Sequence, residues 1–166
     1  MLRKALRLIC VATLLSFTVS CSTEDSSNEA DEKLQIVTVY DYSPLEIETM
    51  TLINNYRVGI GLNALERINH VSFKSEEHDN YMIANNVVNH DAFVERSDNI
   101  IKSLGALRVS ENIAYNYNSA QGAFDAWMNS KGHRENIEGN FSHFGLSIRE
   151  NPVNGRKYYT NIFVKM

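Results

Sequence analysis

The chain contains two cysteines, Cys10 and Cys21, and both lie within its first 21 residues. Everything that follows must therefore fold without a disulfide and rely on its hydrophobic core. From about Leu34 to Met166 there is room for one domain of ordinary size, and the sequence shows no internal repeat. We assign this domain to residues 41–166.

The first twenty residues have the pattern of an export signal. They begin with three basic residues, Arg3, Lys4 and Arg7, and continue with an uncharged run from Leu8 to Val19. That run is about a dozen residues long, whereas a membrane-spanning helix needs roughly 20. We therefore expect residues 1–20 to be a signal peptide and the protein to be exported rather than integral to a membrane.

The end of this segment, Thr18-Val-Ser-Cys21, resembles the lipobox of bacterial lipoproteins, in which the cysteine becomes the acylated first residue. Each buried acyl methylene contributes about 0.8 kcal/mol, so several chains on one cysteine give a stable anchor. We expect lipidation of Cys21, with ordinary secretory cleavage and a free thiol as the alternative. Ser22 is compatible with sorting to the outer membrane, facing either the periplasm or the surface.

Residues 22–33 are acidic and almost free of large apolar side chains, so they cannot bury enough surface to order. We expect residues 21–40 to form a tether. Without residues 1–20, which hold three of the 16 basic residues and no acidic one, the chain has 13 basic and 20 acidic residues and a net charge of −7. No basic stripe is present, which argues against nucleic acid as a partner.

Capping residues and apolar spacing predict four helices. The first begins at Ser43-Pro-Leu-Glu46, which has the form of a capping box with proline at the first helical position, and ends near Gly59. The others are expected over residues 68–88, over residues 98–104 before Gly105, and after Ser119.

Alternating apolar residues predict strands. One strand is expected within residues 106–117, where Ser110-Glu-Asn112 interrupts the alternation. Residues 144–148 alternate, and residues 158–164 alternate again after a turn at Asn151-Pro-Val-Asn-Gly155, so the chain should end in a β-hairpin. Helices followed by a terminal hairpin indicate an α+β fold, with helices layered on an antiparallel sheet.

Three of the five histidines have an ordinary interpretation. His78 lies on the apolar face of the second predicted helix, where a core histidine is commoner than a catalytic one. His70 is expected at the surface, and His143 is expected at the edge of a strand.

His90 and His133 differ because each follows directly on a predicted helix. The partial negative charge of a helix C-terminus favours a protonated imidazole, typically by about 0.3–1 kcal/mol. With Glu111 in the interrupted strand, three ionisable groups stand at element ends, where sites tend to be built. We interpret Gly132 as the helix stop that turns His133 into a cleft. No zinc-protease spacing links these residues.

Two motifs carry a family resemblance. Ser110-Glu-Asn-Ile-Ala114 resembles the Gly-Glu-Asn-Ile-Ala motif of bacterial CAP domains, and Ala126-Trp-Met-Asn-Ser-Lys-Gly-His-Arg-Glu-Asn-Ile137 resembles their Trp-Met-Asn-Ser-Pro-Gly-His-Arg signature. These domains belong to the superfamily of cysteine-rich secretory proteins, antigen 5 and pathogenesis-related 1 proteins. The likeness covers nearly everything after the tether. It implies a three-layer α-β-α sandwich with one central cleft.

By this resemblance, the cleft would hold His90, Glu111 and His133, with Ser130 beside them. Some family members bind a divalent cation, commonly zinc, through the two histidines, so His90 and His133 are the expected metal ligands. The sequence departs from many eukaryotic members, which have a second glutamate in the helix of Trp127. This missing acid weakens the expectation of a tightly held metal.

Three functions fit these observations. The first is a lipid-anchored, non-enzymatic domain whose cleft binds a small molecule, lipid or peptide, with or without a divalent ion. The second is a metal-assisted hydrolase acting on peptide or another envelope polymer, with Glu111 as the catalytic base. The third is a structural role in which Glu111 and His133 pair to brace loops. We favour binding or a structural role over catalysis, because no nucleophile stands beside a base.

Overall fold

The structure, a computed structural model, describes residues 35–166. The predicted signal peptide (1–20), the predicted lipidation site Cys21 and the predicted tether up to residue 34 lie outside the described residues. Among residues 35–166, no helix combines the length and the apolar character needed to cross a membrane.

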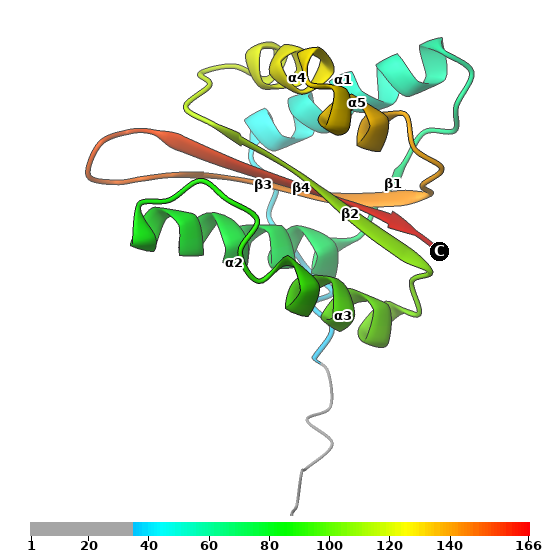
Figure 1. Cartoon of the computed structure of the whole chain (residues 1–166), viewed down its shortest axis with the longest axis horizontal. Coiled ribbons are helices and arrows are strands. Elements are labelled where there is room, and N and C mark those ends of the chain that lie inside the picture. The colour runs from blue at the N-terminus through cyan, green and yellow to red at the C-terminus, as the bar shows by residue number, and fades with distance from the viewer. Residues whose placement is uncertain (1–34) are drawn as a thin grey trace, which may run out of the picture. The chain divides into compact units, whose positions relative to one another are not determined.

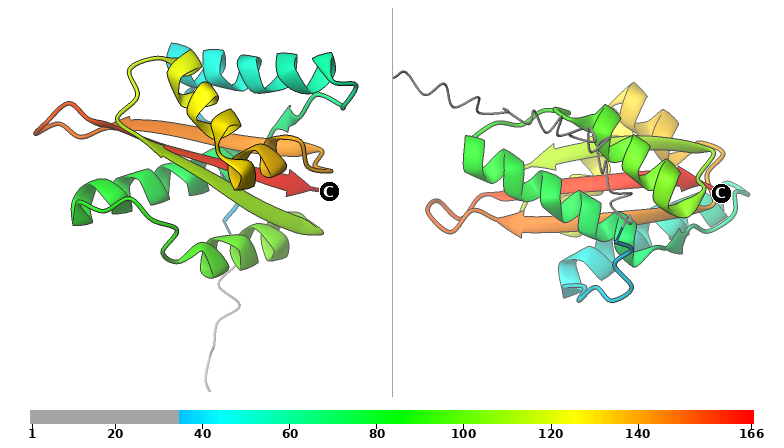
Figure 2. Two further views of the ribbon diagram at one scale, coloured as in Figure 1. Left: turned by 45° about the horizontal axis from the view of Figure 1, so that its top comes forward. Right: turned by 90° about the horizontal axis from the view of Figure 1, so that it is seen from below.

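The described chain forms a sheet between two layers of helices (Figure 1). The elements are α1 (Pro44–Gly59), β1 (Glu66–Arg67), α2 (Asn69–Asn85), α3 (Phe93–Leu104), β2 (Arg108–Tyr115), α4 (Ala120–Asn129), α5 (Lys131–Ile137), β3 (His143–Glu150) and β4 (Lys157–Lys165). Helices α2 and α3 cover one face of the sheet, and α1, α4 and α5 cover the other (Figure 2). The predicted α+β, three-layer sandwich and its C-terminal hairpin, β3–β4, are confirmed.

The strand order is β1-β3-β4-β2, so β1 and β2 form the two edges of the sheet. Strands β2, β4 and β3 pair in antiparallel fashion, as predicted. The sheet differs from the prediction at β1, a two-residue strand that runs parallel to β3.

Helix α1 begins as the sequence predicts. The Glu46 N–H donates to Ser43 Oγ (3.3 Å), and the Ser43 N–H donates to Glu46 Oε2 (2.7 Å), which completes the capping box. Glu46 is also fully buried, and its Oε1 accepts hydrogen bonds from Ile148 N–H and Arg149 Nη1, both at 2.8 Å. The residue that caps α1 therefore also joins this helix to β3.

The chain turns between α4 and α5 in a way that the sequence did not indicate. Helix α4 ends at Asn129, Ser130 is extended (φ −98°, ψ 121°), and α5 begins at Lys131. Gly132 lies inside α5 and has no positive φ, so its interpretation as a helix stop was wrong. One extended residue is enough to redirect the chain, and His133 belongs to the first turn of a new helix.

Strand β2 and helix α3 are more regular than predicted. Ser110-Glu-Asn112 does not interrupt β2, which pairs with β4 from Arg108 to Tyr115. Glu111 and Asn112 point to opposite faces of the sheet and are both buried against polar partners, which explains why apolar alternation fails there. Helix α3 starts at Phe93 rather than at residue 98. No capping side chain marks this start, because the residue before it is Ala92, in the left-handed region (φ 55°).

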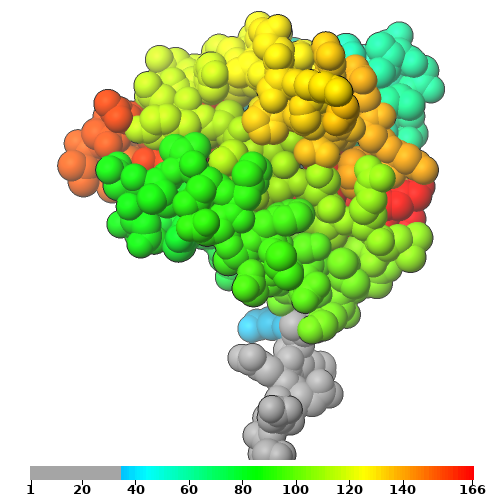
Figure 3. Space-filling view, viewed as in Figure 1, coloured from blue at the N-terminus to red at the C-terminus, as the bar shows by residue number. Residues whose placement is uncertain are grey.

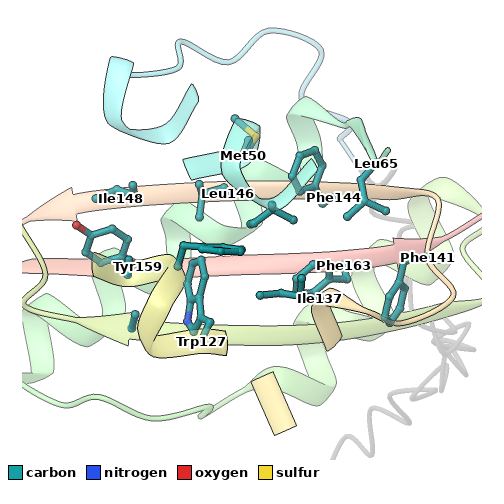
Figure 4. Packing of buried hydrophobic residues seen from close by; sticks show 14 residues of the cluster. Met50, Leu65, Trp127, Ile137, Phe141, Phe144, Leu146, Ile148, Tyr159 and Phe163 are labelled. Atoms are coloured by element: carbon teal, nitrogen blue, oxygen red, sulfur yellow. The ribbon is translucent and has the colours of Figure 1, made fainter. Parts of the chain in front are cut away.

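The main hydrophobic core lies between the sheet and the layer of α1, α4 and α5 (Figure 4). Its aromatic members are Phe124, Trp127, Phe141, Phe144, Tyr159 and Phe163. A smaller apolar cluster on the opposite face consists of Val71, Ile100, Ala106, Ile162 and Val164. Helix α2 passes so close to β3 at Gly145 that an added Cβ would clash with the main chain of Val71 and Ser72.

Contacts with the domain begin ahead of residue 41. The Asn69 side chain donates to the Thr38 carbonyl (2.7 Å), and Arg149 Nη2 donates to the Tyr40 hydroxyl (2.6 Å). The segment from about residue 37 to 40, which the sequence assigned to the tether, thus contacts α2 and β3.

His70 was predicted at the surface, and this prediction was wrong. It is 2% exposed, because its Nδ1 accepts from the Val37 N–H (3.3 Å) and its Nε2 lies 3.1 Å from Asn99 Oδ1. His70 therefore connects the N-terminal segment, α2 and α3. Sequence periodicity could not show this, because the N-terminal segment has no regular structure.

Candidate functional site

The centre of the candidate site is the Glu111 carboxylate on β2. Its side chain is 1% exposed and faces the α2–α3 layer. Arg96 of α3 holds both oxygens: Nε donates to Oε2 (3.0 Å), and Nη2 donates to Oε2 (2.9 Å) and Oε1 (3.0 Å). Such charge-assisted, forked contacts fix a carboxylate firmly in place. Glu111 is therefore an anchored group.

His90 lies in the connection between α2 and α3. Its Nδ1 is 2.8 Å from Glu111 Oε1, and its side chain is 49% exposed. A carboxylate at Nδ1 favours the proton on that nitrogen and leaves the lone pair of Nε2 free to bind a ligand. The prediction that His90 directly follows a helix was wrong. Helix α2 ends at Asn85, and the effect of a helix dipole does not extend past the last turn.

His78 supports this arrangement from α2. It is buried, as predicted for a core histidine, and its Nε2 lies 2.8 Å from the Asn89 carbonyl, next to His90. Its Nε2 is also 3.9 Å from Glu111 Oε1. Burial lowers the pKa of His78 in spite of the nearby Glu111 carboxylate. A neutral His78 thus positions the main chain that carries His90.

His133 and Ser130 lie in a separate groove of about 300 Å³. The groove is lined by Ile113, Ala114, Tyr115, Tyr117, Ala126, Trp127, Ser130 and His133. Burial lowers the pKa of His133, and the charge of His90 lowers it further. Helix α5 is held to β2 by Asn112, whose Nδ2 donates to the His133 carbonyl (2.9 Å) and whose Oδ1 accepts from Asn136 (2.8 Å).

The site therefore has two parts on opposite sides of β2. His90 and Glu111 belong to the α2–α3 side, whereas His133 and Ser130 belong to the side of α4 and α5. Because β2 is an edge strand, the two sides can meet around it. Figure 3 shows this face of the molecule, with α5 above β2 and the α2–α3 segment below it.

Sequence analysis identified His90, Glu111 and His133 but missed Arg96, which donates hydrogen bonds to both oxygens of the Glu111 carboxylate. Arg96 lies ahead of residues 98–104, the range predicted for this helix, because no capping residue marks the true start of α3. The signal that could have found it is the small number of basic residues between His90 and Glu111, where Lys102 and Arg108 are the only others. A buried carboxylate requires a cation, and the candidates in this stretch are few.

A tightly bound zinc ion does not fit the donors that the structure brings together. Within residues 35–166 there is no group of three or more His, Cys, Asp or Glu side chains that could hold a metal ion. Both oxygens of Glu111 are bound by Arg96, and one of them also contacts His90. The available donors are imidazole nitrogens of His90 and His133, and two ligands are too few for a closed zinc site.

Comparison with protein families gives a match for most of the described chain. Residues 50–164 match the cysteine-rich secretory protein family, CAP. A curated relative, the uncharacterized membrane protein YlbC of Bacillus subtilis (strain 168), is 30% identical over 133 residues. The alignment covers 72% of this chain and 34% of YlbC, so the chain spans about a third of that relative's length.

Three solved structures share the fold. An extracellular protein of Bacillus anthracis that contains an SCP domain has a TM-score of 0.64 and 23% identity, over 77% of this chain and 45% of its own. An outer surface protein of Borrelia burgdorferi has a TM-score of 0.66 and 16% identity, over 78% and 98%. A cysteine-rich secretory protein of Staphylococcus aureus has a TM-score of 0.60 and 18% identity, over 74% and 39%.

Proposed function

The chain belongs to the cysteine-rich secretory protein family, CAP, and from this premise we propose that it is a ligand-binding module rather than an enzyme. The observation that carries the proposal is the saturation of Glu111. Its two oxygens accept hydrogen bonds from Arg96, and His90 adds a further contact. A carboxylate held in this way orients a histidine and is poorly placed to take a proton from water.

The groove at His133 indicates the kind of ligand. Its lining is mostly apolar and aromatic, with Ser130 and His133 as polar groups. Its volume of about 300 Å³ lies at the lower end of the range for small-molecule sites. We expect it to take a small, largely apolar molecule or the end of a lipid or peptide chain. Ser130 and His133 would supply one or two orienting hydrogen bonds.

Binding can be tested with a set of small apolar fragments that carry one polar group, measured by ligand-observed NMR on the full chain. Ala126→Trp fills the groove and should abolish binding. Thr51→Trp introduces the same side chain on α1, outside this groove, and is the matched control. Equal binding to the wild type and to Ala126→Trp would remove the groove as the site.

The hydrolase alternative assigns Glu111 as a base acting with His90 and His133. A screen of peptide and envelope-polymer substrates decides between the two functions, with Glu111→Gln as the control. Turnover that falls at least about 100-fold in Glu111→Gln would support general base catalysis. Turnover that this variant retains would exclude Glu111 as the base.

The structural alternative paired Glu111 with His133, and this pairing is wrong. Glu111 contacts Arg96 and His90 on one side of the sheet, whereas α5 places His133 on the other. The difference arises because adjacent residues of a strand point to opposite faces, and the side chain of Asn112, not Glu111, faces α5.

Metal binding through His90 and His133 is a proposal of its own. A titration with zinc chloride, followed by calorimetry, should give a weak signal that disappears in His90→Ala/His133→Ala. Equal binding by the double variant would show that the zinc lies elsewhere. We assign no reaction to this ion.

For location, we infer an exported protein of the cell envelope that is anchored by lipid on Cys21, in the outer membrane. The support is the lipobox resemblance of Thr18-Val-Ser-Cys21. Cells fed with an alkyne fatty acid should label the wild type but not Cys21→Ser, and fractionation should move the variant out of the membrane fraction. Equal labelling of both proteins would exclude this anchor.

A further inference from the structure

A second and larger groove lies at the opposite edge of the sheet, between α1 and β1. Its volume is about 570 Å³, and its lining consists of Ile47, Met50, Thr51, Asn54, Asn55, Leu65, Glu66, Arg67 and Phe144. Figure 4 shows three of these side chains, Met50, Leu65 and Phe144, gathered where α1 approaches β1 and β3. The groove thus has an apolar floor, and exposed polar residues of α1 and β1 surround it.

Strand β1 pairs with β3 on one side only, so the main-chain groups on its other side point away from the sheet. The Glu66 N–H donates to the Ser142 carbonyl and the Ile68 N–H to the Phe144 carbonyl, both at 3.0 Å, so these two residues face β3. Main-chain groups of alternate strand residues point in opposite directions within the sheet. Leu65 and Arg67 therefore point away from β3, along the edge of the sheet.

Asn54 of α1 already fills the place of a neighbouring strand at Leu65. Its Oδ1 accepts from the Leu65 N–H (2.8 Å), and its Nδ2 donates to the Leu65 carbonyl (3.0 Å). Two residues further along, Arg67 lines the same groove, and within residues 35–166 its outward N–H and C=O have no hydrogen-bond partner. An unpaired edge of this kind is a template for another main chain.

We propose that this groove binds an extended peptide segment of a partner protein. The segment pairs with the main chain of Arg67 as an added strand and places one apolar side chain on the floor formed by Met50, Leu65 and Phe144. Main-chain pairing supplies affinity and the pocket supplies selectivity, as in other cases of strand addition. This site is independent of the His90 and His133 site.

The free edge and the groove fit a peptide better than an acyl chain. A lipid tail would use the apolar floor but leave the Arg67 N–H and C=O without a partner. A peptide satisfies both, and the exposed Thr51 and Asn55 side chains across the groove can bond to its polar groups. The pairing extends over one residue, because Asn54 occupies the position before it.

The test uses the full chain and blocked five-residue peptides of threonine with a central leucine, methionine or phenylalanine. Chemical shifts of the backbone amides report both the affinity and the location of binding. Arg67→Pro removes the outward N–H but none of the hydrogen bonds to β3, and proline is tolerated in edge strands. Arg67→Ala keeps the N–H and is the matched control.

We expect at least one peptide to bind, with shifts centred on β1 and α1. Arg67→Pro should weaken binding at least tenfold relative to Arg67→Ala. Equal affinity in the two variants would overturn the proposal, as would the absence of binding by every peptide at about 1 mM. If a fully N-methylated peptide binds equally well, the groove takes apolar chains without main-chain pairing, and strand addition is excluded.

If Arg67→Pro fails to fold, Thr51→Trp, which fills the groove from an exposed helix position, decides the question. A tenfold loss in this variant supports the proposal, and unchanged affinity overturns it. Ala126→Trp, which fills only the His133 groove, should bind the peptide normally.

Discussion

The two faces of the sheet are lined by different kinds of side chain. Towards α1, α4 and α5 the core is mainly aromatic and aliphatic, with Trp127, Tyr159 and Phe163 buried among apolar neighbours. Towards α2 and α3 a small apolar cluster shares the space with buried polar and charged groups, namely Ser75, His78, Asp79, Arg96, Glu111 and Thr160.

The two faces of the sheet are stabilised in different ways. On the α1 side, stability comes mainly from apolar area removed from water, at about 25 cal/mol per Å², although Glu46 and Arg57 are buried there too. On the α2 side it depends on each polar group finding its partner. Asp79 illustrates the cost. It accepts a hydrogen bond from the Thr160 hydroxyl (2.6 Å), yet burial raises the pKa of its carboxyl well above the usual value.

The largest effect is expected on the apolar face. Trp127→Ala removes the largest core side chain and leaves the Ile113 carbonyl without its indole N–H donor, which lies at 2.8 Å. We expect the free energy of unfolding in urea to fall by about 4–5 kcal/mol. A loss of less than about 2 kcal/mol would show that this face does not depend on packing.

A slightly smaller effect is expected from breaking the ion pair of the polar face. Arg96→Met leaves Glu111 buried without its cation and should lower the free energy of unfolding by about 3 kcal/mol. The double variant Arg96→Met/Glu111→Leu should regain most of that loss, because no buried charge is left. Additive losses in the double variant would contradict this account of the face.

Part of the pH dependence of stability should come from His78 on the polar face. The folded-state pKa of His78 is lowered by burial, so the unfolded chain binds more protons below about pH 6.5. The contribution of His78 to stability is full above that pH and is lost as the pH falls towards its folded-state pKa. His78→Gln should therefore flatten the decline of stability between about pH 7 and pH 5, and an unchanged slope would rule out His78 as a source.

The smallest effect is expected at a position that touches neither face. Gly132 is exposed within α5, and an added Cβ would meet nothing within 4 Å. Gly132→Ala should raise the free energy of unfolding by about 0.5 kcal/mol, because alanine loses less conformational entropy in a helix. A clear loss of stability would instead restore Gly132 as a helix stop.

The sequence predicted best where local rules decide the structure. The capping box at Ser43, the alternation of the C-terminal hairpin and the glycine at the end of α3 all act over a few residues, and all three occur as predicted. It failed where partners lie far apart in the chain. The polar stretch at Glu111 looked like an interruption, because Arg96 and Asn136, which make it compatible with a buried strand, are 15 and 24 or more residues away.

In the candidate site, too, the residues could be predicted from local motifs, but their arrangement could not. Motif resemblance located His90, Glu111 and His133, but it could not say which of them face one another. That depends on the side of β2 on which each lies and on the one-residue turn at Ser130. The resemblance predicted one cleft with His90, Glu111, His133 and Ser130, whereas the groove of about 300 Å³ is lined by Ser130 and His133 without the other two. The groove between α1 and β1 was not predicted, since its lining comes from elements that are distant in sequence.

The position of Glu46 has a consequence for the order in which the elements of the domain fold. Its local role in the capping box is available as soon as α1 emerges, but its bond to the Ile148 N–H spans 102 residues. Contacts of such sequence separation form late and slow folding. The first helix therefore reaches its final packing only after the last hairpin has formed, and until then Glu46 Oε1 must stay in water.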